Sequence, residues 1–271
     1  MMRHRAAYAA IGMSVFALAV PALSETVKET VEADVSTRSV EITSDFTGTE
    51  ILIFGTVENS RQPSPEAGTY DVVVVIEGTP VPQVVRRKSN FAGLGLWINT
   101  REIRFASFPS YYAIASTRPV DEIAERAILG KLEIGFEHVR MVPSGSGTRF
   151  APAGEKEANE FRSAAIRLKQ RDGLYVTKNQ GVAFIGRSLF RSSILLPPNV
   201  PVGPLNTRVY LFREGQILSQ YKSQVMLERA GLERFLYERA QKRPLLYGLS
   251  TVVLAAAAGL AAAFAFRRPG Q

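Results

Sequence analysis

The stretch from Trp97 to Arg118 is the part of the sequence that most resembles a binding site. It holds the only tryptophan of the chain together with Phe, Tyr and Arg residues. Arginine forks bind oxyanions through paired hydrogen bonds, and aromatic rings can form the walls of a groove. One hypothesis is a small-anion or peptide site made by Trp97, Arg101, Arg104, Tyr111, Tyr112 and Arg118. The alternative is that the rings belong to a hydrophobic core and the arginines to a solvated face.

Other patterns that could carry chemistry are weaker. His138 and Met141 are three residues apart, which in a strand places them on opposite faces, so a shared metal ion would need a bulge or a helical turn. Ser219 and Lys222 have the Ser-x-x-Lys spacing of penicillin-binding enzymes, but they fall in a predicted strand and the accompanying motifs are missing. The chain has no cysteine, which excludes disulfides and thiolate nucleophiles. We expect no enzyme, no metal site and no cofactor.

The N-terminal segment predicts export. Residues 1–24 combine a basic start, the apolar run Ala6–Val20 and small residues before a cut after Ser24, which is typical of a signal peptide. An uncleaved N-terminal anchor is the alternative. In either case the body of the protein is expected to be exported, and in a Gram-negative cell it would be periplasmic.

The C-terminal segment predicts a membrane span. Pro244–Phe266 contains no charged residue and would form a helix about 34 Å long, enough to cross a bilayer. The pair Arg267 and Arg268 follows it, so residues 267–271 are expected to be a cytoplasmic tail of a single-pass inner-membrane protein. Small residues four apart form one helix face that permits close contact with another helix: Ala255, Gly259 and Ala263. Packing against lipid alone is an equal alternative for this face.

The positive charge lies partly in these ends. The formal net charge of +8 comes from 33 Lys and Arg against 25 Asp and Glu. Four of the arginines lie in the two end segments, which contain no acid, so the body carries a net charge of about +4. This charge gives little reason to expect binding to nucleic acid.

The sequence between the two ends predicts a mainly β fold. Runs of strand length are separated by turn residues, at Val27–Val35, Ser39–Ile42, Glu50–Val57, Asp71–Glu77, Gln83–Lys88, Leu94–Ile98, Ile103–Ala106, Leu174–Val176, Val182–Ile185, Leu189–Leu195, Arg208–Phe212 and Ile217–Leu227. This spacing favours one or two immunoglobulin-like antiparallel β-sandwich domains with short inserted helices. We assign residues 25–118 to a first β-sandwich domain and 119–227 to a second β-rich domain.

Three helices are predicted outside the span. Residues 119–130 and Glu155–Arg171 have helical spacing of apolar side chains and helix-ending signals, and both belong to the second domain. Residues 228–243 form a basic amphipathic helix that leads into the membrane span. It could lie at the lipid headgroups or act as a rigid stalk.

A shift of 137 residues aligns parts of the two β regions. It places Glu77 on Glu214 and Gly78 on Gly215, and it carries Leu52 to Leu189. Each half would then read as strand, loop, strand, Glu-Gly turn, strand. A true duplication and a chance match between hairpins remain open interpretations.

The chain also resembles the putative transmembrane protein family of alphaproteobacteria, over nearly its whole length. The stretches that carry the resemblance are Phe108–Pro119, Leu189-Phe-Arg191, Leu196–Gly203, and the tail from Tyr247 to Arg267. Pro204-Leu205 departs from the family, which more often continues into a Tyr and a strand. The resemblance implies a C-terminal single span and, because the family's genes often lie beside sulfite-exporter-type permeases, a role as a transporter accessory. It implies no catalytic residue.

Three functional hypotheses follow. The first is a membrane-anchored, non-catalytic partner of a membrane transporter, possibly a sulfite-exporter-type anion permease. The second is a tethered small-anion-binding module that uses the Trp97–Arg118 region. The third is an envelope-assembly or adhesion module. Beyond the lipid bilayer and a permease, the sequence identifies no partner, and it leaves homo-oligomer formation open.

Overall fold

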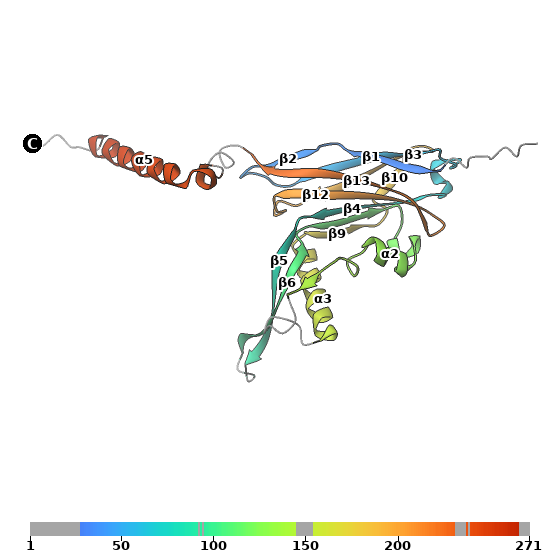
Figure 1. The fold of residues 1–271 in the computed structure, drawn as a ribbon, viewed down its shortest axis with the longest axis horizontal. Coiled ribbons are helices and arrows are strands. Elements are labelled where there is room, and N and C mark those ends of the chain that lie inside the picture. The colour runs from blue at the N-terminus through green and yellow to red at the C-terminus, as the bar shows by residue number, and fades with distance from the viewer. Residues whose placement is uncertain are drawn as a thin grey trace, which may run out of the picture.

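The computed structural model describes residues 28–91, 93, 95–144, 154–230, 237 and 239–265. The expected signal peptide (1–24) and the tail (267–271) lie outside the described residues. The prediction of a mainly β fold with a few helices and one C-terminal apolar helix is confirmed (Figure 1). Strands in this part of the chain form sheets of four, six and three members.

Two of these sheets form a sandwich. The four-stranded sheet has the order β1–β3–β11–β10, with β1 at Thr30–Val35, β3 at Thr49–Glu58, β11 at Leu189–Leu196 and β10 at Val182–Phe184. The six-stranded sheet has the order β2–β13–β12–β4–β7–β9, with β2 at Ser39–Ile42, β13 at Gln216–Arg229, β12 at Gly203–Arg213, β4 at Asp71–Gly78, β7 at Tyr112–Ser116 and β9 at Tyr175–Lys178. Most neighbouring strands run antiparallel, whereas the outer pairs β2–β13 and β7–β9 are parallel.

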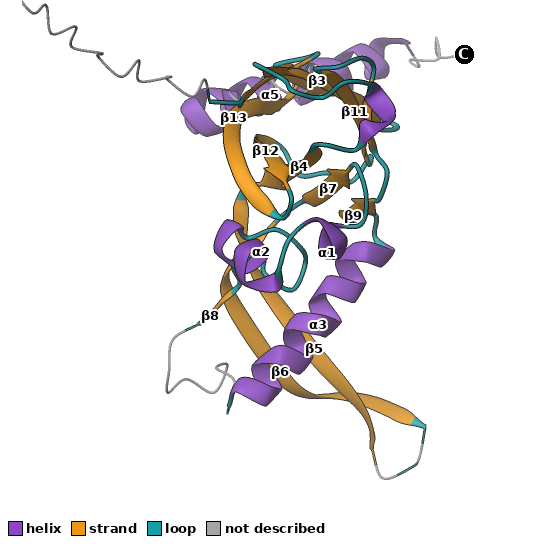
Figure 2. Cartoon of the chain, turned by 90° about the vertical axis from the view of Figure 1, so that its right-hand side faces the viewer, coloured by secondary structure: helices purple, strands orange, loops and turns teal. Residues whose placement is uncertain are grey.

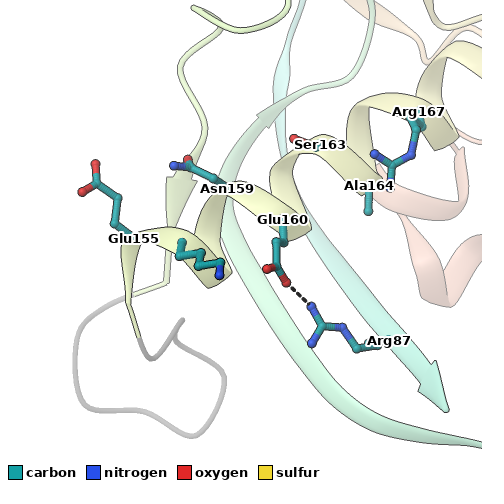
Figure 3. A pocket seen from close by; sticks show the side chains of 8 residues that line it. Arg87, Glu155, Asn159, Glu160, Ser163, Ala164 and Arg167 are labelled. Atoms are coloured by element: carbon teal, nitrogen blue, oxygen red, sulfur yellow. Dashed lines mark hydrogen bonds and ion pairs between the residues drawn. The ribbon is translucent and has the colours of Figure 1, made fainter.

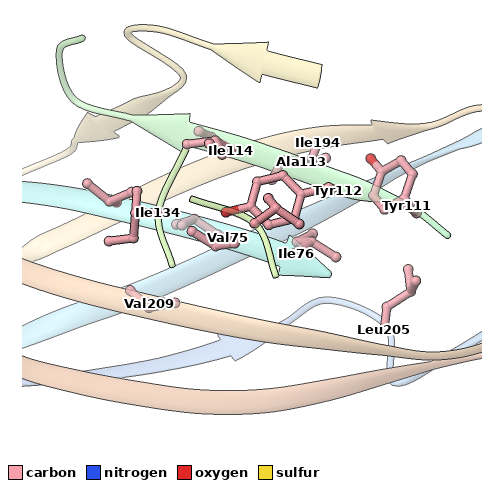
Figure 4. Packing of buried hydrophobic residues seen from close by; sticks show 14 of the residues in the cluster. Val75, Ile76, Tyr111, Tyr112, Ala113, Ile114, Ile134, Ile194, Leu205 and Val209 are labelled. Atoms are coloured by element: carbon pink, nitrogen blue, oxygen red, sulfur yellow. The ribbon is translucent and has the colours of Figure 1, made fainter. Parts of the chain in front are cut away.

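The core lies between the two sheets and continues beneath the six-stranded one. Side chains alternate between buried and exposed along β3 and β11, because only one face of their sheet is covered. In contrast, β7 is buried at every residue and β4 at all but one, because helical segments cover the outer face of their sheet. Ile134 packs there near Val75, while Ile194 of β11 approaches the same sheet from the opposite side (Figure 4).

Strands from both predicted domains pair with one another. β3 is hydrogen-bonded to β11, with Ile53 opposite Ser192, and β4 is hydrogen-bonded to β12, with Val73 opposite Tyr210. Each pair joins a strand from residues 25–118 to one from residues 119–227. The structure therefore places the two β regions in one shared sandwich. The boundary at residue 118 falls just after β7, an interior strand of the six-stranded sheet.

The shift of 137 residues maps several strands onto strands, but it takes β1 onto residues 167–172 at the end of the helix α3 (Glu155–Arg171). It takes β2, β3 and β4 onto β9, β11 and β12, and it takes the start of β5 onto β13. Equivalent residues also face each other across the two central pairs, because Phe54 is opposite Arg191 and Val73 is opposite Tyr210. Each of the two pairs thus contains one residue pair that is 137 positions apart.

A long hairpin projects from the sandwich. It is formed by β5 (Pro80–Phe91) and β6 (Leu96–Pro109), and the short β8 (Val142–Pro143) pairs with β6 near its base. The helix α3 (Glu155–Arg171) lies along the hairpin, at the residues predicted (Figure 2). β6 joins two segments that the sequence suggested as separate strands, Leu94–Ile98 and Ile103–Ala106. We call the β5–β6 hairpin the arm.

The remaining helices differ in part from expectation. The predicted helix at 119–130 is two helices, α1 (Val120–Ile123) and α2 (Arg126–Leu132), because Ala124 adopts an extended conformation between them. The predicted helix at 228–243 starts later than expected, since Glu228 and Arg229 belong to β13. The apolar helix α5 covers Pro244–Ala265, and its segment Pro244–Phe264 is long and apolar enough to cross a membrane.

Candidate functional site

The residues predicted to form one anion or peptide site lie in three different parts of the molecule. Trp97 is at the far end of the arm, Arg101 and Arg104 are along it, and Tyr111, Tyr112 and Arg118 are in the sandwich. β6 alone has 14 residues, which is about 46 Å of extended chain. The structure therefore separates the tryptophan from the tyrosines instead of bringing them into one groove.

The two tyrosines belong to the core. Both have fully buried side chains, and their hydroxyls donate hydrogen bonds to main-chain carbonyls, Tyr111 to Leu195 at 3.1 Å and Tyr112 to Glu133 at 2.7 Å. Burial raises the pKa of both phenols. These side chains fasten neighbouring segments to the six-stranded sheet.

Arg118 is held by a carboxylate. Its Nε and one terminal nitrogen donate to the two oxygens of Asp71, at 2.9 and 2.8 Å, and Thr117 Oγ1 donates to the same carboxylate at 2.9 Å. Asp71 is buried at the start of β4, so the bidentate pair neutralises a charge at the sheet end. The hydrogen bonding that Arg118 donates to Asp71 is the main reason that the pKa of Arg118 is raised.

Arg101 connects the arm to α3. Its guanidinium donates to both oxygens of Glu157, at 3.1 and 3.2 Å. Arg87 lies directly opposite Arg101 on β5, and it is paired with Glu160 at 2.7 Å. Two cations facing each other across a hairpin repel, and the two acids of α3 offset this repulsion. Arg104 pairs with Glu102 on its own strand at 3.3 Å.

A polar groove runs between α3 and the arm. It has a volume of about 780 Å³ and is lined by Arg87, Glu155, Lys156, Asn159, Glu160, Ser163, Ala164 and Arg167. Figure 3 shows Glu160 and Arg87 joined across it. Apart from Arg87, its lining comes from the side of α3 opposite Phe161, which packs into the core. The sequence missed this groove, although a polar helix face opposite an apolar one was a visible signal.

The far end of the arm is apolar and uncovered. Leu96, Trp97 and Ile98 have 60%, 66% and 44% of their surface exposed. Residues 89–100 contain no charged side chain. A hairpin end exposed on both faces has no core to stabilise it. The sequence pattern suggested that Trp97 belongs either to the core or to a ligand groove, whereas the structure places it on this exposed end.

The partly buried charge cluster under the α1–α2 segment is structural. Arg208 pairs with Glu77 at 3.0 Å and donates to the Leu132 carbonyl at 3.3 Å, and Tyr210 donates to the same carbonyl at 3.2 Å. Desolvation raises the pKa of Glu77, although Arg208 opposes the shift. This cluster attaches α2 to the sheet face.

The weaker motifs are placed as follows. Met141 is buried and His138 is partly exposed. Among the described residues, no group of three or more His, Asp or Glu side chains is positioned to hold a metal ion. Ser219 Oγ accepts a hydrogen bond from the Val31 N–H at 3.2 Å, which ties β13 to β1.

The helix α5 presents its side chains outward. Within the described residues, no part of its apolar segment Pro244–Phe264 is buried against the body. The small residues Ala255, Gly259 and Ala263 are all exposed on it. An added Cβ at Gly259 would meet no atom within 4 Å. The face is therefore geometrically open to another helix or to lipid.

Comparison with known proteins identifies the family of the chain. No curated protein and no solved structure matches the chain. A family model described as "Putative transmembrane protein" matches residues 30–268, which include the sandwich, the arm and α5. The match extends over most of the chain and confirms the family resemblance. The chain belongs to this transmembrane protein family and has one candidate membrane span at its C-terminus.

Proposed function

We propose that the protein is a non-catalytic accessory partner of a membrane transporter, with its body in the periplasm and its C-terminus in the cytoplasm. The observation that supports this proposal is the exposure of α5, whose apolar segment Pro244–Phe264 does not pack against the described body. A helix whose faces are all exposed has its packing surface available for a second protein in the bilayer. Ala255, Gly259 and Ala263 supply the small side chains that allow close approach.

The charged side chains of the body support a scaffold role over small-anion binding. Arg101 and Arg118 are each committed to a carboxylate through two hydrogen bonds, to Glu157 and Asp71 respectively. An oxyanion would have to displace these partners, and it would find the arginines in different parts of the fold. We therefore favour a body that positions surfaces, and the transporter we name is an anion permease of sulfite-exporter type.

The test is crosslinking of the full-length protein in cells, followed by detergent extraction and mass spectrometry. We expect one polytopic permease to be enriched with the wild-type chain. Gly259→Leu should reduce its recovery, because the larger side chain prevents close helix contact. Ala261→Leu adds the same bulk on the opposite side of α5 and should leave recovery unchanged. Recovery of the chain without a permease would contradict the proposal.

A further inference from the structure

The arm and the membrane anchor leave the body from the same end of the six-stranded sheet. Gly78, next to the base of the arm, lies opposite Leu205 of β12, and Leu205 lies opposite Val225 of β13. Gly203 lies opposite Leu227, so the end of β13 that leads to α5 is at this same end of the sheet. Two strand spacings, about 10 Å, separate the two exits. The arm base is therefore close to the part of the body that is tethered to the bilayer (Figure 1).

The arm is long compared with the tether. Fourteen residues, 230–243, separate β13 from α5. They span about 50 Å if fully extended and about 21 Å if helical. Residues 239–242 are helical, and the Arg229 guanidinium lies 4.8 Å from the ring of Tyr237, which holds the tether near the end of β13. β6 extends for about 46 Å, which exceeds the helical length of the tether and nearly equals its fully extended length, so the end of the arm is within reach of a bilayer that the tether holds close to the body.

The end of the arm has the chemistry of a bilayer interface. Leu96, Trp97 and Ile98 are exposed, and no charge occurs from Ser89 to Thr100. Tryptophan is enriched at the headgroup level because its ring is apolar and its N–H is polar. Behind the uncharged end lies a collar of basic side chains, made by Arg86, Arg87, Lys88, Arg101 and Arg104. Three acids pair with members of the collar, which leaves it a net charge of about +2.

We propose that the end of the arm, at Leu96–Ile98, inserts into the interface of the same bilayer that holds α5, with the basic collar at anionic phospholipid headgroups. The body then has two membrane contacts, one covalent through α5 and one reversible through the arm. Two contacts fix the orientation of the sandwich over the membrane, and a single tether does not. α3 holds the arm through the Arg101–Glu157 and Arg87–Glu160 pairs, so the orientation is transmitted to the body.

Trp97 is the only tryptophan, so tryptophan fluorescence of the full-length protein, excited at wavelengths that tyrosine does not absorb, reports on the end of the arm alone. The protein is reconstituted, with the body outward, in vesicles of phosphatidylethanolamine and phosphatidylglycerol. We expect doxyl-labelled lipids in the host vesicle to quench Trp97 and aqueous iodide to be excluded from it. Leu96→Ser with Ile98→Ser should reverse both results while the thermal transition of the body stays unchanged.

Two further variants provide controls. Leu195→Ser removes an equally exposed leucine from β11, outside the arm, and should behave as wild type. Lys88→Gln removes one cation of the collar and should reduce the ratio of inserted to free arm about fivefold. Iodide quenching of wild-type Trp97 without quenching by host lipids would overturn the proposal. Quenching only by doxyl lipids in separately added vesicles would also overturn it, because the arm would then reach another membrane.

Discussion

Glu77-Gly78 and Glu214-Gly215 are the same dipeptide, and the 137-residue shift aligns them, but they have different structural roles. Glu214 and Gly215 both have positive φ, 50° and 80°, and form the two-residue turn that folds β13 back onto β12. Glu77 is the partner of Arg208, and the Gly78 N–H donates to the Tyr111 carbonyl at 2.8 Å. The first dipeptide continues a strand, whereas the second reverses the chain.

This difference creates the arm. After Gly215 the chain returns directly, so β13 lies beside β12 in the sheet. After Gly78 the chain leaves the sheet through β5, returns along β6, and only then supplies β7 as the neighbour of β4. The arm is thus an excursion at the position where the other half has a turn. The two segments share the Glu-Gly dipeptide, but their flanking residues and their tertiary partners differ.

The first prediction compares two positions that the 137-residue shift aligns, and it has the largest expected effect. Gly55 and Ser192 are 137 residues apart, and each lies opposite a buried large side chain, Phe190 and Ile53 respectively. A Cβ at Gly55 would clash with the Glu32 carbonyl oxygen and lie 2.5 Å from Phe190 Cζ. Gly55→Ala should lower the free energy of unfolding by roughly 1–3 kcal/mol in urea denaturation.

Ser192→Ala should have the opposite sign. The Ser192 hydroxyl is buried, and it has no hydrogen-bond partner among the described residues. Replacing it by a methyl group removes a desolvated polar atom and should raise the free energy of unfolding by about 1 kcal/mol. Changes of the same sign in the free energy of unfolding for Gly55→Ala and Ser192→Ala would show that these contacts do not distinguish the two aligned positions.

The second prediction compares the two glutamates. The pKa of Glu77 is raised by desolvation, so the folded state binds its proton more tightly than the unfolded state does. Stability from this group is therefore lost as pH rises from about 4.5 through the folded pKa, with a slope no steeper than about 1.4 kcal/mol per pH unit. Relative to wild type, Glu77→Gln should gain stability over that interval when urea unfolding is measured at several pH values.

The matched control is Glu214→Gln. Glu214 is exposed on the turn, so this variant makes the same substitution at a residue that remains in contact with water. If the free energy of unfolding changed with pH in the same way for Glu77→Gln and Glu214→Gln, the desolvation of Glu77 would not distinguish the two dipeptides energetically.

The third prediction compares the arm with the sandwich, and its expected effect is the smallest. Arg101→Ala breaks the partly exposed pair with Glu157, so the free energy of unfolding should fall only slightly. Hydrogen exchange should become faster in β5 and β6 and stay unchanged in β4 and β12, because the arm has little core of its own. Equal acceleration in the sandwich would show that the arm and the sandwich unfold as one unit.

Local patterns predicted much of the fold. The expected bounds of Ser39–Ile42 and Glu155–Arg171 match β2 and α3, and most other strands agree within a few residues. These elements have clear alternation or helical periodicity. β7 was missed, because Tyr112–Ser116 contains two alanines and no alternation, and it is a strand only because β4 and β9 pair with it. The candidate site residues were grouped by their closeness in sequence, and a single long strand separates them.

The apolar span and the mainly β character could be predicted from the sequence, since each depends on composition or on periods of a few residues. The pairing of β3 with β11 and of β4 with β12 is decided by the tertiary structure, because it joins segments more than 100 residues apart. The same holds for the two Glu-Gly dipeptides and for the exposed end of the arm. What such a residue contacts depends on which distant strand lies beside it, and no local pattern contains that information.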